Sequence, residues 1–404
     1  MNRREFLKSS LTVSTASALG AATAVAASTP EADAEPPRVK KYRPLGNTGF
    51  KMSDISLGTG LLQSPSMFYR ALDRGINYFD TAPDYGQAEI HMGKVLAKYD
   101  KRDEIFIASK FCDHVPYQAG VSHLQLPKSK DDYIAAVEGS LTRLNTDRLD
   151  VVFVHAIGEL ADREREQRRL LDENMLAAVE ALKKAGKVRF LACSSHGPHG
   201  LEDLLGQAVD SGHFDLIMPA FNFMSFPELP EVIKKANAKG MAVVAMKTLA
   251  GAKDMEIRAG EVPFEHAAFK WVLQHPEVSG LVVSMKNFSD LDHYLRASGG
   301  SFETADKVAL NRYATRFGAE YCRTGCGDCE VACPANVRIA TILRYQMYFD
   351  DYGDQKKAME SYASLDGGID ACATCSTSDC NRACPHGLPV RTKLGAAHQT
   401  LTLA

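Results

Sequence analysis

The order of apolar segments along this chain predicts an α/β fold class, in which a (β/α)8 TIM barrel is followed by a small, mostly helical C-terminal domain rich in cysteine. Eight short segments of β-forming residues alternate with amphipathic helical segments. This alternation indicates parallel strands with both faces of the sheet covered. Eight such units over ~250 residues match the usual size of a closed barrel. Eight of the ten cysteines then follow near the C-terminus.

The expected strands begin after residue 50 and recur at regular intervals. They cover residues 55–58, 76–80, 105–110, 150–155, 188–193, 215–220, 242–247 and 280–284. Between them, segment 176–188 has apolar residues at helical spacing and ends near Gly186, and segment 268–276 ends at Pro276. A doubly wound open sheet is the alternative fold. It would require a glycine-rich loop at the first helix, and Gly-Thr-Gly at 58–60 lacks the third glycine of that motif, so the barrel is favoured.

The first residues have the pattern of an export signal. Arg3 and Arg4 precede a weakly apolar segment, 9–27, which contains a small-residue cleavage pattern at 24–26. This is typical of a twin-arginine signal peptide, which is read by the machinery that exports folded proteins, so we expect a periplasmic location. A disordered basic start is the alternative interpretation. No later apolar run approaches the ~18 residues needed to span a membrane.

Composition and charge limit the remaining function classes. The net charge is −3, and acidic and basic residues are interspersed, which argues against nucleic-acid binding. A chain of 404 residues can hold one large domain and an appendage. We therefore expect four parts: a signal peptide at 1–27, a linker at 28–39, the barrel at 40–314 and the cysteine-rich domain at 315–404.

Polar residues end three successive strands of the expected barrel. Asp80, Lys110 and His155 stand at the ends of the second, third and fourth strands, and Tyr85 follows Asp80 on the next loop. Each alone is a common strand-end or half-buried residue, but the carboxyl ends of barrel strands meet at one mouth. There an ammonium would lower the pKa of the phenol, Asp80 would hold the lysine, and the histidine would orient a substrate oxygen. This set suits proton delivery to a carbonyl oxygen while hydride reaches the carbon.

Several motifs resemble those of the aldo-keto reductase family, in order and spacing, over residues 40–300. They are KYRPLGNTGFKMSDISLGTG, YFDTAPDYGQAE, IASK, VVFVH and GKVRFLACSS. The resemblance implies a catalytic tetrad of Asp80, Tyr85, Lys110 and His155, with the tyrosine as general acid and a nicotinamide cofactor as hydride donor. It also implies a short hairpin that closes the barrel floor.

The expected cofactor site departs from the family pattern. The resemblance assigns cofactor contacts to Ser194, Ser195, Asn222, Met246, Lys247, Ser284 and Lys286. Ser195 replaces the usual asparagine, Met218 replaces a glutamine, and Met246 replaces a tyrosine that stacks on the nicotinamide. A thioether can still pack against a ring face, and Lys286 could meet a phosphate. We expect NADP(H) or NAD(H), and the sequence does not decide between them.

The C-terminal cysteines form two clusters that each end in Cys-Pro. The first comprises Cys322, Cys326, Cys329 and Cys333, and the second comprises Cys372, Cys375, Cys380 and Cys384. This spacing resembles ferredoxin-type extensions, with one extra residue in one gap of the first cluster and two in one gap of the second. It implies a ferredoxin-like iron–sulfur domain with two [4Fe-4S] clusters. Crossed ligation would join Cys384 to the first three thiolates and Cys333 to the next three.

Zinc and disulfides are the alternatives for these cysteines. Four-cysteine zinc sites use similar pairs, and an oxidising periplasm favours disulfides. Export after folding lets clusters be installed inside the cell first, and the Cys-Pro endings favour iron–sulfur. Cys112 and Cys193 fall outside both clusters. We expect Cys193 to be a small core residue and Cys112 to line the barrel mouth.

The sequence therefore predicts an exported oxidoreductase that interconverts a carbonyl and an alcohol. Its partners would be a small-molecule substrate, a sugar among the candidates, and a redox partner for the clusters. The clusters would either transfer electrons or stabilise the structure. Both roles stay open because hydride transfer moves two electrons, whereas one [4Fe-4S] cluster moves one. The alternatives are an electron-transfer or binding subunit whose barrel has lost activity, and a sugar-binding protein.

Overall fold

The computed structural model describes residues 35–113, 123–224, 228–256, 260–365 and 367–402. The predicted signal peptide at 1–27 lies outside these residues, as does the linker up to residue 34. The chain divides into two units, Met1–Pro36 and Pro37–Ala404, and the description below concerns the second. Among the described residues, no helix combines the length and apolar character needed to cross a membrane.

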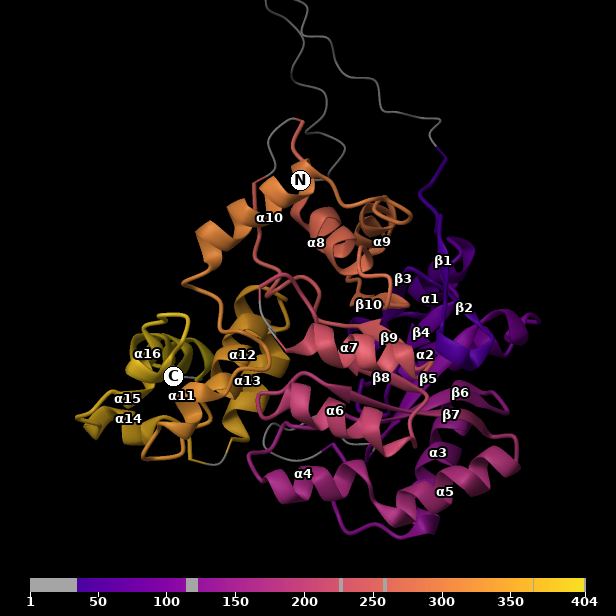
Figure 1. The fold of residues 1–404 in the computed structure, drawn as a ribbon, viewed down its shortest axis with the longest axis horizontal. Coiled ribbons are helices and arrows are strands. Elements are labelled where there is room, and N and C mark those ends of the chain that lie inside the picture. Colours follow the sequence, from indigo (N-terminus) through magenta and orange to yellow (C-terminus); the bar gives the residue numbers. More distant parts are fainter. Residues whose placement is uncertain (1–34, 114–122, 225–227, 257–259, 366, 403–404) are drawn as a thin grey trace, which may run out of the picture. The chain divides into compact units, whose positions relative to one another are not determined.

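Eight parallel strands close into a barrel in the order β10-β3-β4-β5-β6-β7-β8-β9 (Figure 1). They are β3 (Ile55–Gly58), β4 (Tyr78–Asp80), β5 (Phe106–Phe111), β6 (Leu149–Val154), β7 (Val188–Ser195), β8 (Leu216–Pro219), β9 (Ala242–Ala245) and β10 (Gly280–Ser284). The last strand pairs with the first, with Leu281 opposite Ile55. The predicted (β/α)8 barrel is confirmed, and the open-sheet alternative is wrong.

The predicted strand ends shift by one or two residues where the backbone leaves the ladder. His155 stands just past β6, and the next residue, Ala156, has φ 50°. Met246 and Lys247 stand past β9, where Met246 makes an isolated bridge to Ala220 and Lys247 has φ 54°. These left-handed residues turn the chain outward at the mouth of the barrel.

Helices and short 3-10 turns surround the strands. They are α1 (Pro65–Asp73), α2 (Ala88–Leu96), α3 (Lys130–Leu144), α4 (Arg163–Leu170), α5 (Glu173–Lys184), α6 (Leu201–Ser211), α7 (Leu229–Ala238), α8 (Phe264–Leu273), α9 (Phe288–Leu295), η1 (Gly46–Thr48), η2 (Thr59–Leu61) and η3 (Arg102–Glu104). Local sequence sets their ends. Ser129 and Asp132 form a capping box at the start of α3, and Asn145 ends it in the left-handed conformation.

A hairpin closes the floor of the barrel, as expected. Strand β1 (Tyr42–Pro44) pairs antiparallel with β2 (Lys51–Ser53). Leu45 and Met52 from this hairpin are fully buried against the residues that fill the barrel interior. The barrel interior is thus a packed core.

The C-terminal part is helical, as predicted. Its helices are α10 (Thr304–Phe317), α11 (Asp328–Val331), α12 (Ile339–Asp350), α13 (Gln355–Ala363), α14 (Asp370–Thr374), α15 (Asp379–Ala383) and α16 (Val390–Leu401). The expected boundary after residue 314 falls inside α10, where the ring of Tyr313 stacks 3.8 Å from that of Phe264 in α8. The remaining helices have their own apolar core, and we call residues 318–402 the C-terminal module.

The C-terminal module packs on the loops that follow the barrel strands. Arg344 lies 3.1 Å from His196, and Lys253 forms an ion pair with Asp351 at 2.9 Å. The backbones approach closely at Gly197, where an added Cβ would stand 2.4 Å from Gly325 Cα. The module therefore covers the end of the barrel at which functional residues gather.

Close packing of α2 against α3 requires a glycine and supplies a stability test. A Cβ added at Gly93 would stand 2.2 Å from the carbonyl oxygen of Arg143. We expect Gly93→Ala to lower the free energy of unfolding by about 1–3 kcal/mol, because the helices must separate. Thermal melting measures the change. The matched control is Gly206→Ala in α6, where no heavy atom lies within 4 Å, and a comparable loss in that variant would contradict the explanation.

Candidate active site

Strand register brings the lysine and the aspartate together at the mouth. Asp80 pairs with Ala108 across β4 and β5, and Lys110 lies two residues further along on the same face. The Lys110 Nζ donates to Asp80 Oδ1 at 2.5 Å and to the carbonyl oxygen of Thr81 at 2.7 Å. Both side chains are buried, so water screens the pair little.

Tyr85 lies beside this ion pair with its ring facing the ammonium. The Lys110 Nζ is 5.1 Å from the ring centroid, and the ring of His155 stands edge-on at 5.9 Å. Burial first, and then the Asp80 and Asp84 carboxylates, raise the pKa of Tyr85 well above its usual value. The prediction that the lysine lowers this pKa is wrong, because Asp80 neutralises the ammonium and a second carboxylate lies nearby. Tyr85 therefore holds its proton at neutral pH.

His155 is held in place by a buried pair behind it. Arg169 donates to the carbonyl oxygen of His155 and pairs with Glu166 at 2.9 Å, while Glu166 accepts from the backbone N–H of Gly158. Burial first, and then the positive charge at His123, hold the pKa of His155 well below its usual value. His155 is therefore a neutral imidazole.

A second charged network lies next to the tetrad, and the sequence did not predict it. His123 Nδ1 lies 2.5 Å from Asp84 Oδ2, and His123 Nε2 lies 3.1 Å from Glu159 Oε2. The rings of His123 and His155 stack at 3.7 Å. Burial alone would lower the pKa of His123, but Glu159 and Asp84 raise it to about 9. The only sequence signal was position, since Asp84 precedes Tyr85 and Glu159 follows His155 by four residues.

The four tetrad residues line one cavity of about 400 Å³. Of the expected cofactor contacts, the cavity is lined by Ser194, Met246, Lys247, Ser284 and Lys286. Ser195 and Asn222 are buried behind this lining. The Ser195 hydroxyl donates to the carbonyl oxygen of Ile157, and the Asn222 amide donates to that of Lys247.

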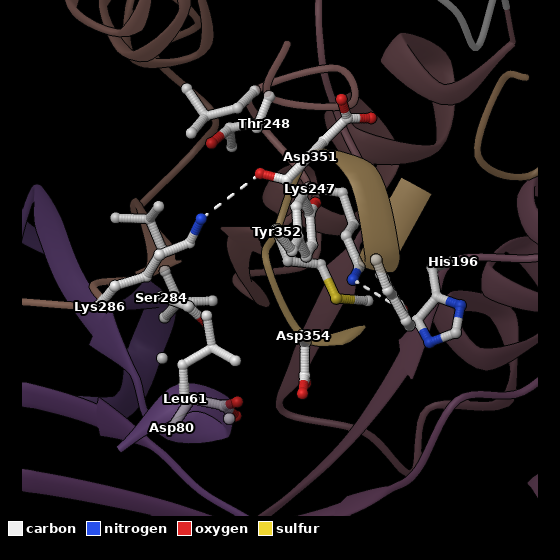
Figure 2. Close-up of a pocket in the computed structure, with 18 of the residues that line it drawn as sticks. Leu61, Asp80, His196, Lys247, Thr248, Ser284, Lys286, Asp351, Tyr352 and Asp354 are labelled. Atoms are coloured by element: carbon white, nitrogen blue, oxygen red, sulfur yellow. Dashed lines mark hydrogen bonds between the residues drawn. The ribbon is translucent and has the colours of Figure 1, made fainter. Parts of the chain in front are cut away.

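The C-terminal module supplies the opposite wall of the cavity. Its residues there are Arg344, Tyr348, Asp351, Tyr352, Asp354 and Lys357. Figure 2 shows Lys286 reaching across to Asp351, whose carbonyl oxygen accepts at 3.4 Å. The Lys247 Nζ lies 3.5 Å from the hydroxyl of Tyr348. Lys247 and Lys286, which we expected to contact the cofactor, thus contact the module.

The lysine effect that we expected at Tyr85 occurs at Tyr348 instead. Burial raises the pKa of Tyr348, but the positive charges of Lys247, Arg344 and Lys357 outweigh it and bring the pKa below its usual value. The rings of Tyr348 and Tyr352 stack at 5.3 Å. The cavity therefore holds one phenol that keeps its proton and a second, on α12, that gives it up more readily.

The eight C-terminal thiols fall into two groups in space. Burial and the neighbouring Cys326 and Cys384 raise the pKa of Cys322 to about 12, and Cys384 also acts on Cys326 and Cys329. Cys333 lies instead among Cys372, Cys375 and Cys380, where it raises the pKa of Cys372 and Cys380. Helix α11 packs against α15, so each group draws thiols from both sequence clusters.

The fold defines a (β/α)8 barrel with its polar site at the carboxyl ends of the strands. Residues 63–255 match the sequence profile of the Aldo/keto reductase family. Aldo-keto reductase AFTS1 of Alternaria alternata is 27% identical over 250 residues, which cover 52% of this chain and 66% of that protein. Aldo-keto reductase YhdN of Bacillus subtilis is 31% identical over 168 residues, covering 38% and 47%.

Solved structures give the same result for the fold. A protein described as a candidate aldo-keto reductase of Pseudomonas aeruginosa is 26% identical with a TM-score of 0.53, covering 68% of this chain and 98% of that one. The holo form of an aldo-keto reductase of Bacillus halodurans, at 22% identity and a TM-score of 0.54, covers 67% and 95% and supports the fold alone. The chain spans just under two thirds of the length of AFTS1.

The buried Lys110–Asp80 pair gives a second stability test. Removing one partner leaves an uncompensated buried charge, so we expect Lys110→Met to destabilise the protein by about 3–5 kcal/mol. The double variant Lys110→Met/Asp80→Leu should regain most of that loss, because both charges are gone. Thermal melting of the three proteins measures the effect. Equal destabilisation in the single and double variants would show that packing matters more than charge.

Proposed function

We propose that the protein is an oxidoreductase that interconverts a carbonyl and an alcohol by hydride exchange with a nicotinamide cofactor. The observation that carries the proposal is Tyr85, a half-buried phenol whose raised pKa keeps it protonated, beside Lys110 and neutral His155 in one cavity. A group that holds a proton at neutral pH can deliver it to an oxygen as negative charge develops there. The family of the barrel domain and its named relatives support the same chemistry.

Tyr85, Lys110 and His155 have different roles in the proposed proton transfer. The Tyr85 hydroxyl donates its proton to the carbonyl oxygen, and its raised pKa keeps that proton in place until negative charge develops on the oxygen. The ion pair of Lys110 with Asp80 lies beside the ring and fixes this part of the barrel mouth. Neutral His155 hydrogen-bonds the substrate oxygen and fixes its position. Burial of the pair and the ring excludes water from this step. In the reverse direction, the phenolate takes the proton from an alcohol.

The cavity lining fits a nicotinamide dinucleotide in its chemistry. Met246 offers a soft apolar surface for a ring, while Lys247 and Lys286 offer cations for phosphates. The cofactor, NADP(H) or NAD(H), would supply hydride to the carbonyl carbon when bound. Its phosphates would compete with Tyr348 and Asp351 for the two ammonium groups.

The grouping of thiols supports two [4Fe-4S] clusters in the C-terminal module. One would be held by Cys322, Cys326, Cys329 and Cys384, and the other by Cys333, Cys372, Cys375 and Cys380. Thiolate is the ligand that such clusters require. The clusters would exchange single electrons with a redox partner or stabilise the module that forms one wall of the cavity.

Export is part of the same proposal. The twin arginine at 3–4 and the apolar segment after it support passage through the twin-arginine machinery to the periplasm. This route carries folded proteins, so clusters and cofactor would be loaded before export. The substrate would be a small carbonyl or alcohol, with sugars included, since hydroxyl-rich ligands suit a cavity lined by carboxylates and lysines.

Replacing the proposed acid tests the enzyme directly. We expect Tyr85→Phe to lower the rate of NADPH- or NADH-dependent reduction of a carbonyl panel by about 10²–10⁴-fold, because the proton donor is lost. Steady-state kinetics on anaerobically purified mature protein measure this rate. Tyr69→Phe, at an exposed site on α1, is the control and should keep full activity. Inactivity of the parent, with clusters that reduce reversibly, would favour the electron-transfer subunit.

Cysteine replacement tests the clusters separately. We expect Cys326→Ser and Cys372→Ser each to lose about half of the iron and the acid-labile sulfide, because each removes a ligand of one cluster. Cys193→Ser, at a fully buried barrel position, is the control and should retain both. Iron and sulfide analysis with electron paramagnetic resonance of the reduced protein measures this. Zinc in place of iron, or disulfides, would contradict the assignment.

A further inference from the structure

Three metal-ligating side chains converge behind the tetrad. Asp84, Cys112 and His155 each place one ligand atom within 4.8 Å of the other two. All three are buried. They come from the loop after β4, the end of β5 and the end of β6, so three neighbouring strands position them. We infer that Asp84 Oδ1, Cys112 Sγ and His155 Nδ1 form a binding site for a divalent transition metal, with Zn²⁺ as the ion that fits best.

Two of these ligand atoms have no hydrogen-bond partner. Asp84 Oδ1 and His155 Nδ1 are both fully shielded from solvent and unpartnered. The third, Cys112 Sγ, makes a long contact of 3.9 Å with the carbonyl oxygen of Lys110 and a hydrogen bond with the backbone of Asp84. Leaving a buried polar atom unsatisfied is costly, so two such atoms within this cluster of side chains favour a shared ligand. A metal ion satisfies all three at once.

The distances suit a tetrahedral ion after a small adjustment. Ligand atoms around tetrahedral zinc lie about 3.3–3.8 Å apart, given its usual bond lengths. One ligand atom from each of the three side chains lies within 4.8 Å of the others, and His155 Nδ1 is 3.8 Å from the other Asp84 oxygen, Oδ2, so the side chains must draw together by up to about 1 Å around the ion. The second oxygen of Asp84 is held by His123, which is how carboxylate ligands of metals are commonly oriented.

The ligand types select the class of metal. A thiolate with an imidazole and one carboxylate suits zinc and its neighbours in the transition series, and it disfavours magnesium and calcium. Asp84 and the Cys112 thiolate together balance the charge of a divalent ion. Three protein ligands leave a fourth position for water, as in catalytic rather than structural zinc sites.

Such an ion would act on the tetrad by orienting the His155 ring. Binding at Nδ1 fixes the tautomer and ring orientation of His155 and leaves Nε2 as its other nitrogen. The site is separate from the eight cysteines of the C-terminal module, because Cys112 belongs to the barrel. Occupancy by zinc and turnover with a carbonyl are therefore independent measurements.

Zinc X-ray absorption tests the site in the full mature chain with its clusters in place. We expect the anaerobically purified protein, after addition and removal of excess Zn²⁺, to retain one zinc per chain with a single sulfur ligand at about 2.3 Å and nitrogen or oxygen ligands otherwise. A shell of sulfur alone would place the zinc among the clustered cysteines and overturn the assignment.

Matched variants define the ligands. We expect Cys112→Ser to lose the sulfur ligand, and Asp84→Asn to weaken Zn²⁺ affinity at least 10-fold by calorimetry, while Cys193→Ser binds like the parent. Iron content and circular dichroism establish that each variant is folded. Unchanged zinc affinity in folded Cys112→Ser and Asp84→Asn would overturn the proposal. This result does not depend on reductase activity, so a parent that binds zinc but reduces no carbonyl would contradict only the proposed function.

Discussion

The buried ion pair between Lys110 and Asp80 is the interaction on which the barrel mouth depends. It anchors the ends of β4 and β5 through two hydrogen bonds of the ammonium. It also contributes to the state of Tyr85: burial does most to raise the pKa of this phenol, and the Asp80 carboxylate of the pair raises it further. The same group therefore supports the fold and keeps the candidate acid protonated. A free ammonium at this position would favour the phenolate, which has no proton to give.

The cavity belongs to two parts of the chain that are distant in sequence. The barrel provides Tyr85, Lys110 and His155, while the C-terminal module provides Tyr348 from α12 and Asp351, which directly follows that helix. The two phenols differ because their lysines differ. Lys110 is paired with a carboxylate, whereas Lys247 lies against the Tyr348 hydroxyl and ring, with Arg344 and Lys357 adding positive charge. Two tyrosines whose pKa values shift in opposite directions thus line the same cavity. The C-terminal module is therefore part of the site.

The sequence was sufficient to predict the parts of the structure that depend on the alternation of strand and helix segments and on the positions of residues at strand ends. Alternating segments predicted the closed barrel, and strand ends predicted that Asp80, Lys110 and His155 would meet. It was insufficient where a property depends on contacts across the fold. The pKa of Tyr85 rises chiefly because the ring is packed among residues from several strands, and no spacing along the chain gives the extent of that burial. His123 reaches Asp84 and Glu159 from a separate loop, and Tyr348 reaches Lys247 from another module.

The contacts of Lys247 and Lys286 link the module to cofactor binding under the proposed function. Phosphates bound by these ammonium groups would displace or share their present contacts, which run 3.5 Å from Lys247 to the Tyr348 hydroxyl and 3.4 Å from Lys286 to the Asp351 carbonyl oxygen. Lys253 makes a third contact with the same segment, an ion pair with the Asp351 carboxylate. Tyr348 lies on α12 and Asp351 directly follows that helix, so the three lysines hold one short segment of the module against the barrel. A cofactor bound between this segment and the barrel would dissociate slowly, which is what the proposed exported enzyme would need where free nicotinamide is scarce.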